Sequence, residues 1–198
     1  DYNIFSVLQI QSKEVLICRM IADLLNPRGQ HGAGAEYLKI FLRDCLGMEK
    51  MDTKLADQAI VTAEYAIDDE RRIDIVIEIG SYFLPIEVKI YAADQKSQCF
   101  DYYQYAKRRD AQAKVYYLTL DGHRPGKDST SSGSQSVPEE DIVCLSFREH
   151  ILNWLKACKN CENTGMIPIL EQFIRNIEQI SGYTSERVRN MVIDELLT

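Results

Sequence analysis

The sequence predicts an α/β fold of three layers, in which helices cover both faces of a mixed central sheet. Three observations support this prediction. Two strand-like segments, residues 71–79 and 82–90, alternate apolar with charged residues and are separated by a Gly-Ser pair. A segment with helical spacing, 93–109, and a short apolar strand, 113–120, follow them. Amphipathic helical segments precede and follow this region, so both faces of the sheet can be covered.

The individual elements follow from apolar spacing and from the residues that end each segment. Apolar positions at helical spacing span residues 9–25, and Pro27 with the glycines after it ends that helix. A second helix is expected over 35–46, ending at Gly47. Residues 58–67 are rich in strand-forming types and predict the first strand.

The connection through the predicted helix 93–109 sets the topology. A helix between two strands of one sheet is typical of a right-handed crossover between parallel neighbours. The strands that flank this helix are therefore expected to be parallel, whereas the hairpin strands before it are antiparallel.

Length and composition favour a single domain over residues 1–198. The chain has 198 residues, 45% hydrophobic and 27% charged, which is enough for one core and does not require two. We expect the core over about 9–120 and a mobile loop rich in Ser, Gly and Pro over about 121–140. Additional C-terminal helices are expected over about 146–198, in three amphipathic segments.

Composition also limits the classes of function. No apolar run reaches the roughly 18 residues of a membrane span, and Lys13 and Glu14 interrupt the first apolar segment, so we expect a cytoplasmic protein without a membrane partner. The net charge of −7 argues against a sequence-independent nucleic-acid coat. The sequence begins without a methionine, which leaves room for a longer natural chain.

The six cysteines suit reduced, buried thiols better than a disulfide framework, because they are scattered through apolar helical and strand patterns. Cys158 and Cys161 have the spacing of a metal pair. A lone C-x2-C without a second pair is a weak signal for zinc.

The hairpin places acids on neighbouring strands. Side chains alternate along a strand, so Asp74 and Glu78 share a face opposite the isoleucines at 73, 75, 77 and 79. If the Gly-Ser pair is a type II′ turn, Ile79 pairs with Tyr82, and counting back places Asp74 directly across from Glu87.

Two acids in that position repel each other unless a positive charge lies between them. A divalent cation is the simplest candidate, since Mg²⁺ accepts one or two carboxylates and keeps several waters. Lys89 lies two residues beyond Glu87 on the same face. Two carboxylates on a metal with a neighbouring lysine supply what hydrolysis of a phosphodiester requires: a Lewis acid, an activated water and a cation for the developing charge.

A competing interpretation treats these acids as the solvated face of an ordinary strand. In the counted register Arg72 would face Lys89, which fits such a face. Pro85 also lacks the ladder donor and could introduce a bulge that shifts the register. The hairpin alone leaves both interpretations open.

These residues resemble the signature of the PD-(D/E)XK nuclease superfamily, with Asp74 as the first acid and Glu87-Val88-Lys89 as the E-x-K element. Ile73 stands where the signature has proline. The segment 12–42 resembles the opening helices of an uncharacterised bacterial branch, in which an acid on the first helix adds to the metal site. Glu14 is the matching position, although acids also favour the first turn of any helix.

The segment 92–106 resembles the Q-x-x-x-Y element of exonuclease-like branches through Gln98 and Tyr102. Four residues apart on a helix, these two share a face. Gln98 would then hold a substrate phosphate or orient Lys89, and Tyr102 would support it. Taken separately, residues of these types are more often plain interface residues, and it is the order of several matching elements that favours the functional interpretation.

The resemblance implies a restriction-endonuclease-like core and Mg²⁺-dependent cleavage of DNA, with Mn²⁺ able to substitute. It also implies cytoplasmic roles in repair or defence. The site it implies consists of metal ligands, catalytic residues and substrate-binding residues. The implied metal ligands are Asp74, Glu87, the Val88 carbonyl and Glu14; the implied catalytic residues are Asp74, Glu87, Lys89, Glu14 and Gln98; and the implied substrate-binding residues are Gln98 and Tyr102.

The alternative function is a catalytically silent module that keeps the nuclease-like core and binds nucleic acid or a protein partner. The sequence leaves the oligomeric state open, with a homodimer among the options. Glu78 is an outer-ligand candidate, but a solvated position fits it better because it lies nearer the turn. His31 is interpreted as loop structure, and His123 and His150 lack a partner that would suggest catalysis.

Overall fold

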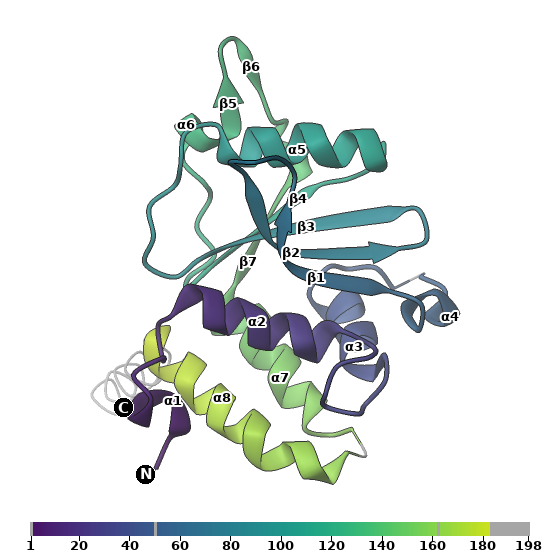
Figure 1. Ribbon diagram of the computed structural model, residues 1–198, viewed down its shortest axis with the longest axis vertical. Coiled ribbons are helices and arrows are strands. Elements are labelled where there is room, and N and C mark those ends of the chain that lie inside the picture. The colour runs from purple at the N-terminus through teal and green to yellow at the C-terminus, as the bar shows by residue number, and fades with distance from the viewer. Residues whose placement is uncertain (1, 50, 162, 183–198) are drawn as a thin grey trace, which may run out of the picture.

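The computed structural model describes residues 2–49, 51–161 and 163–182, and it confirms the layered α/β fold (Figure 1). A five-stranded sheet lies between helices, in the order β1-β2-β3-β4-β7. The first three strands are antiparallel, and β3, β4 and β7 run parallel, so the sheet is mixed. The strands are β1 (Ile60–Ala66), β2 (Arg72–Ile79), β3 (Tyr82–Lys89), β4 (Val115–Thr119) and β7 (Ile142–Ser146).

Helices cover the two faces unequally. One face carries α5 (Gln98–Arg109), which connects the parallel strands β3 and β4 as predicted. The larger helical layer lies on the other face (Figure 1). It consists of α2 (Glu14–Leu25), α3 (Glu36–Asp44), α7 (Leu152–Cys158) and α8 (Ile167–Ile180). Short helices α1 (Ile4–Val7), α4 (Thr53–Ala56) and α6 (Lys127–Thr130) complete the described elements, with a π-helical turn at Phe147–Ile151 and 3-10 turns at Glu139–Asp141 and Thr164–Met166.

The hairpin β2–β3 has the predicted register. Ile79 pairs with Tyr82 across the turn, and Gly80 has a φ of 56°, as the first central residue of a type II′ turn requires. Pro85 pairs with Val76 in the same register, so it causes no shift. The position of every later side chain on β3 is fixed by this turn, because side chains alternate along the strand.

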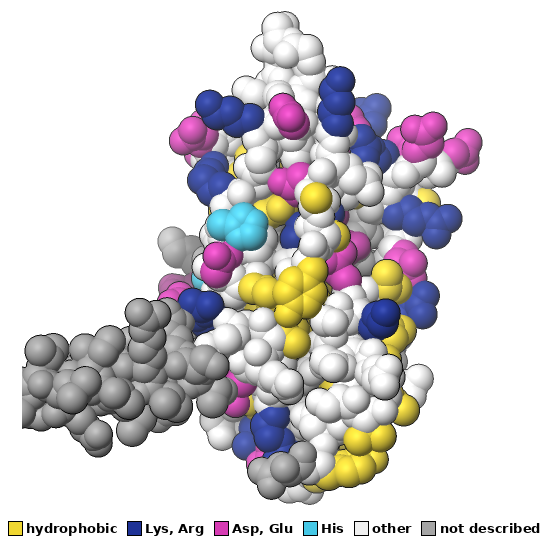
Figure 2. Space-filling model, turned by 90° about the vertical axis from the view of Figure 1, so that its left-hand side faces the viewer, with side chains coloured by type: hydrophobic (Ala, Val, Ile, Leu, Met, Phe, Trp, Pro, Cys, Tyr) yellow, Lys and Arg dark blue, Asp and Glu magenta, His cyan; other side chains and the backbone are white. Residues whose placement is uncertain are grey.

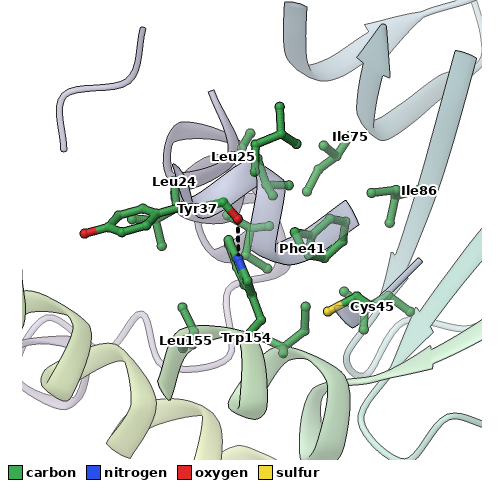
Figure 3. Close-up of a cluster of buried hydrophobic side chains, with 14 of the residues drawn as sticks. Leu24, Leu25, Tyr37, Phe41, Cys45, Ile75, Ile86, Trp154 and Leu155 are labelled. Carbon is green, nitrogen blue, oxygen red and sulfur yellow. Dashed lines mark hydrogen bonds between the residues drawn. The ribbon is translucent and has the colours of Figure 1, made fainter. Parts of the chain in front are cut away.

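The main core lies between the sheet and the larger helical layer. Trp154 of α7 is fully buried there and meets Phe41 of α3 edge to face, with ring centroids 5.3 Å apart (Figure 3). The Trp154 indole N–H donates to the Tyr37 carbonyl at 2.8 Å, which satisfies its one polar atom (Figure 3). A second, smaller core lies under α5 and includes Phe83 and Tyr117.

The structure corrects two predicted helix starts. The first long helix begins at Glu14 and not near residue 9, because Gln9 has a φ of 54° and ends the short α1 region in a turn. The helix predicted from residue 93 begins at Gln98, because Ser97 has a φ of 56°. A left-handed residue cannot continue a right-handed helix, so both starts follow from the backbone.

Three further features differ from the sequence prediction. Ile73 packs in the core under α5 and not with Ile75, so the regular alternation of β2 is broken between these two residues, opposite Glu64 of β1, which has a φ of 52°. The segment 121–140 contains α6 and a small hairpin of β5 (Ser131–Ser132) and β6 (Gln135–Ser136). The strand β7 was not predicted.

The C-terminal part contains the first two of the three predicted helical segments, as α7 and α8. The third predicted helix, within 183–198, lies outside the described residues. Among the described helices, none combines the length and apolarity needed to cross a membrane.

The main core predicts a large effect for its central tryptophan. We expect Trp154→Ala to lower the free energy of unfolding by about 3–5 kcal/mol, because a large buried side chain and its hydrogen bond are lost. Trp154→Phe should cost less. Urea unfolding followed by circular dichroism measures both, with Ile60→Ala as a control at a side chain that is 54% exposed. Equal effects for Trp154→Ala and Ile60→Ala would contradict this packing.

Candidate active site

The predicted site residues from four elements meet in one pocket of about 270 Å³. Asp74 comes from β2, Glu87 and Lys89 from β3, and Glu14 from the first turn of α2. Gln98 and Tyr102 come from α5. The pocket is lined by Glu14, Glu70, Arg71, Arg72, Asp74, Glu87, Lys89, Ala92, Ala93, Gln95, Gln98 and Tyr102.

Asp74 is held by the backbone of the neighbouring strand. The hairpin pairing is regular up to Ile75 and Ile86, the residues next to Asp74 and Glu87, and the two acids are close enough for the charge of Asp74 to raise the pKa of Glu87. The Val88 N–H donates to Asp74 Oδ2 at 2.7 Å. The first acid is therefore fixed against the peptide that lies between the second acid and the lysine.

Glu87 and Lys89 form a buried ion pair. Lys89 Nζ lies 2.6 Å from Glu87 Oε1, and the two residues are 7% and 1% exposed. Glu87 Oε2 is also buried, and it has no hydrogen-bond partner within the described part of the chain. A buried carboxylate oxygen without a partner is costly, and in native proteins such groups are explained by function or by a bound ion or water.

The pKa values of Asp74, Glu87 and Lys89 are all raised. Burial raises the pKa of Asp74, and the nearby Glu14 carboxylate adds to this. Burial raises the pKa of Glu87 well above its usual value, with the Asp74 charge as the next cause. Burial by itself lowers the pKa of Lys89, but Glu87 outweighs it and the net pKa is raised. Each shift favours binding a proton or another cation.

Glu14 reaches the site from the start of α2. Its Oε2 accepts from the Ile90 N–H at 2.8 Å, directly after Lys89 in the chain. Glu14 lies in the first turn of its helix and also next to the acid pair. It can therefore be both a helix-start acid and a residue of the site.

Gln98 and Tyr102 touch each other, as their spacing predicts. Gln98 Nε2 donates to Tyr102 Oη at 3.0 Å, and Tyr102 Oη donates to the Arg72 carbonyl. Both side chains are buried, at 5% and 1% exposed. Tyr102 therefore links α5 to the start of β2, and it holds Gln98 at the wall of the pocket.

Two arginines in the pocket were not predicted as site residues. Arg71 donates to Asp101 Oδ2 at 2.9 Å, to Gln95 Oε1 at 2.8 Å and to the Lys96 carbonyl, so it ties the β1–β2 turn to the N-terminal end of α5. Arg72 is exposed at the pocket. The sequence signal was the pair of arginines directly before the strand of the first acid.

Several other candidates lie outside this pocket. Glu78 pairs with Arg109 at 2.7 Å and is not a pocket residue. His31 is buried in its loop, where its ring contacts the Asn26 carbonyl and the Ala33 N–H, as the loop interpretation predicts. His123 does have an acidic partner: its Nδ1 lies 2.6 Å from Asp121. Neither residue lines the pocket, so this pair lies apart from the candidate site.

The pocket fits a cation site with few protein ligands. Across the described residues, no group of three or more His, Cys, Asp or Glu side chains is arranged to hold a metal ion, Cys158 and Cys161 included. Two carboxylates, one of them with a free buried oxygen, still suit Mg²⁺, which takes one or two carboxylates with waters. Glu14 would be the third acid, but its Oε2 is occupied by the Ile90 N–H.

Comparison with known proteins identifies the family of the chain. The family model of the PD-(D/E)XK nuclease superfamily matches residues 2–176. The chain belongs to the PD-(D/E)XK nuclease superfamily. The match covers α1 through most of α8, so it includes every residue of the pocket. Searches among curated proteins and among solved structures found no match.

The acid pair of this PD-(D/E)XK protein predicts a pH-dependent instability without metal. Because the folded pKa values of Asp74 and Glu87 are raised, the folded state holds protons more tightly than the unfolded state. The free energy of unfolding should fall as pH rises from the ordinary carboxyl range, about pH 4, toward the folded pKa values. We expect Asp74→Asn to raise the melting temperature in EDTA at pH 8, and to have less effect at pH 5.

Thermal unfolding in EDTA at both pH values measures this effect. Asp69→Asn, on the exposed turn between β1 and β2, controls for the loss of one negative charge at the surface. If Asp74→Asn destabilised the protein as much at pH 8 as at pH 5, the raised pKa of the native acid would be wrong.

Proposed function

We propose that this protein is a Mg²⁺-dependent deoxyribonuclease that hydrolyses phosphodiester bonds of DNA. The observation that supports this most strongly is the Asp74–Glu87 pair, in which Glu87 is buried with a free carboxylate oxygen, Asp74 is half-buried and Lys89 lies beside them. A sheet that served only for support would gain nothing from placing two acids together out of water. The family match spans all three residues, and they are the ones whose pattern in the sequence resembles the superfamily signature.

The proposed metal ligands are Asp74, Glu87 and the Val88 carbonyl, with Glu14 assisting. A divalent cation bound there would supply a Lewis acid for a phosphoryl oxygen and lower the pKa of a water. The Val88 N–H already orients the Asp74 carboxylate, so little rearrangement would be needed for Asp74 to bind the ion. Mn²⁺ would occupy the same oxygen ligands.

Lys89 is the proposed partner of the attacking water and of the charge that develops on phosphorus oxygens. Its ammonium is buried and held at the acid pair, where a nearby positive charge is worth more than in water. Gln98, supported by Tyr102, would contact the substrate phosphate or orient Lys89. Arg72, exposed at the pocket, adds a cation for a neighbouring phosphate.

Charge counting explains why substrate binding should depend on the ion. The pocket contains four carboxylates (Glu14, Glu70, Asp74 and Glu87) and three cations (Arg71, Arg72 and Lys89), so its formal charge is −1 without metal. One divalent cation changes this to +1. Phosphate is thus expected to enter only with the ion.

Matched substitutions on the hairpin test catalysis. We expect Glu87→Gln, Asp74→Ala and Lys89→Ala each to lower the rate of DNA cleavage in Mg²⁺ by about 10²- to 10³-fold or more, because each removes a charge from the reacting site. Glu78→Gln, a change of the same type on the same hairpin, should stay within about twofold of wild type. Plasmid and linear DNA in Mg²⁺ or Mn²⁺ provide the assay. Cleavage that persists in Asp74→Ala or Lys89→Ala would reject the assignment.

Metal binding distinguishes the nuclease from a catalytically silent module. We expect titration calorimetry to detect Mg²⁺ binding, and Mg²⁺ at 100 times its Kd to stabilise the fold by about 2.7 kcal/mol. Asp74→Asn and Glu87→Gln should lose both effects, while Glu78→Gln should keep them. Apparent affinity should rise with pH, since protons compete for the same oxygens. No heat and no melting shift in the wild-type protein would favour the silent module.

A further inference from the structure

Tyr91 is an exposed aromatic residue in the segment that connects two residues of the pocket, although it is not itself a lining residue. It is 68% exposed, and it lies in the chain between Lys89 and Ala92, both of which line the pocket. Among the described residues, none makes a hydrogen bond to its hydroxyl or packs a ring against it. Exposing a large aromatic surface has a cost, so an exposed ring at a site rim is a candidate for ligand contact.

The backbone on both sides of Tyr91 is held in place. The Ile90 N–H is bonded to Glu14, and the Ile90 side chain packs in the main core. After it, Asp94 accepts from Tyr117 Oη at 2.6 Å and from the Gly126 N–H at 2.7 Å. The ring is therefore presented from a loop that is anchored at both ends, and little ordering would be needed on binding.

The surroundings of the ring combine apolar and charged surface. The bond from Ile90 to Glu14 brings the first turn of α2 beside residue 91, where Val15 is 46% exposed. Figure 2 shows this side of the molecule, the left in Figure 1, with hydrophobic side chains exposed among acidic and cationic ones. Arg72 is exposed at the same pocket.

We infer that Tyr91 stacks on an unpaired base next to the scissile phosphate, so that the substrate is single-stranded DNA or a frayed end. This rests on the proposed nuclease function. Aromatic stacking beside a phosphate-binding groove is how proteins hold single strands, and every base offers a face to stack on. Inside a duplex the bases already stack on each other, and an exposed ring has nothing to contact.

The charge of the protein supports the same substrate. Duplex binding draws its affinity from many phosphate contacts made by Lys and Arg. This chain has a net charge of −7, and the pocket itself contains more acids than cations. A single strand held by one base stack and one or two phosphates needs far fewer cations. Stacking would then supply binding affinity that this acidic surface cannot supply through phosphate contacts.

Binding of matched strands tests the inference. A labelled 16-nucleotide strand and its duplex, both with phosphorothioate linkages that slow hydrolysis, are titrated with protein in Mg²⁺ and followed by fluorescence anisotropy. We expect Tyr91→Ala to weaken single-strand binding by about 5- to 150-fold, the loss of one base stack, and to change duplex binding less than twofold. Tyr91→Phe should bind as wild type, because stacking does not need the hydroxyl.

Tyr82→Ala is the control, since Tyr82 is another exposed tyrosine, 40% exposed, at the far end of the hairpin. It should bind both DNAs as wild type. Equal single-strand binding by wild type and Tyr91→Ala, or equal weakening of strand and duplex, would overturn the stacking inference and leave the nuclease proposal intact. If wild type neither binds nor cleaves any DNA in Mg²⁺, the nuclease proposal fails and the inference fails with it.

Discussion

The rest of the site depends on two carboxylates held together at the open end of a hairpin, where Glu87 is buried and Asp74 is half-buried. Asp74 and Glu87 would repel if both were charged, and burial makes each charge more costly. The fold keeps them adjacent through the Val88 N–H and the Lys89 ammonium, which together offset part of this cost. The remaining deficit of positive charge links the stability of the folded protein to pH, and it would link stability to the proposed metal ion in the same way.

The surrounding fold explains how the protein tolerates the electrostatic cost of placing the two acids together. The strands β2 and β3 lie inside the sheet, between β1 and β4, and their apolar side chains pack in both cores. Two helices then contribute side chains from opposite faces: α2 supplies Glu14, and α5 supplies Gln98 with Tyr102. Because each contributor is anchored by a backbone hydrogen bond or a buried side chain, the pocket is organised before any ligand binds.

An acidic composition is compatible with the proposed nucleic-acid substrate, because the net charge of the whole chain and the local charge of the pocket have different effects. The net charge of −7 describes the whole surface and disfavours wide phosphate contact. Within the pocket, a single divalent ion would reverse the sign of the local charge, which would confine affinity for phosphate to the proposed site of cleavage. Such a protein would gain substrate affinity from local features, among them the exposed ring of Tyr91.

The sequence by itself determined the features that depend on local periodicity. The hairpin register followed from one turn and the alternation of side chains, and with it the approach of Asp74 to Glu87; the pairing of Gln98 with Tyr102 followed from helical spacing. Only the tertiary structure decided where two helices begin, in which core one strand residue packs, and which arginines line the pocket. Ser97 and Gln9 delayed their helices, Ile73 turned to the other core, and Arg71 and Arg72 entered the pocket. The reason is that periodicity acts between neighbours in the chain, whereas backbone breaks and pocket walls are set by packing between elements far apart in sequence.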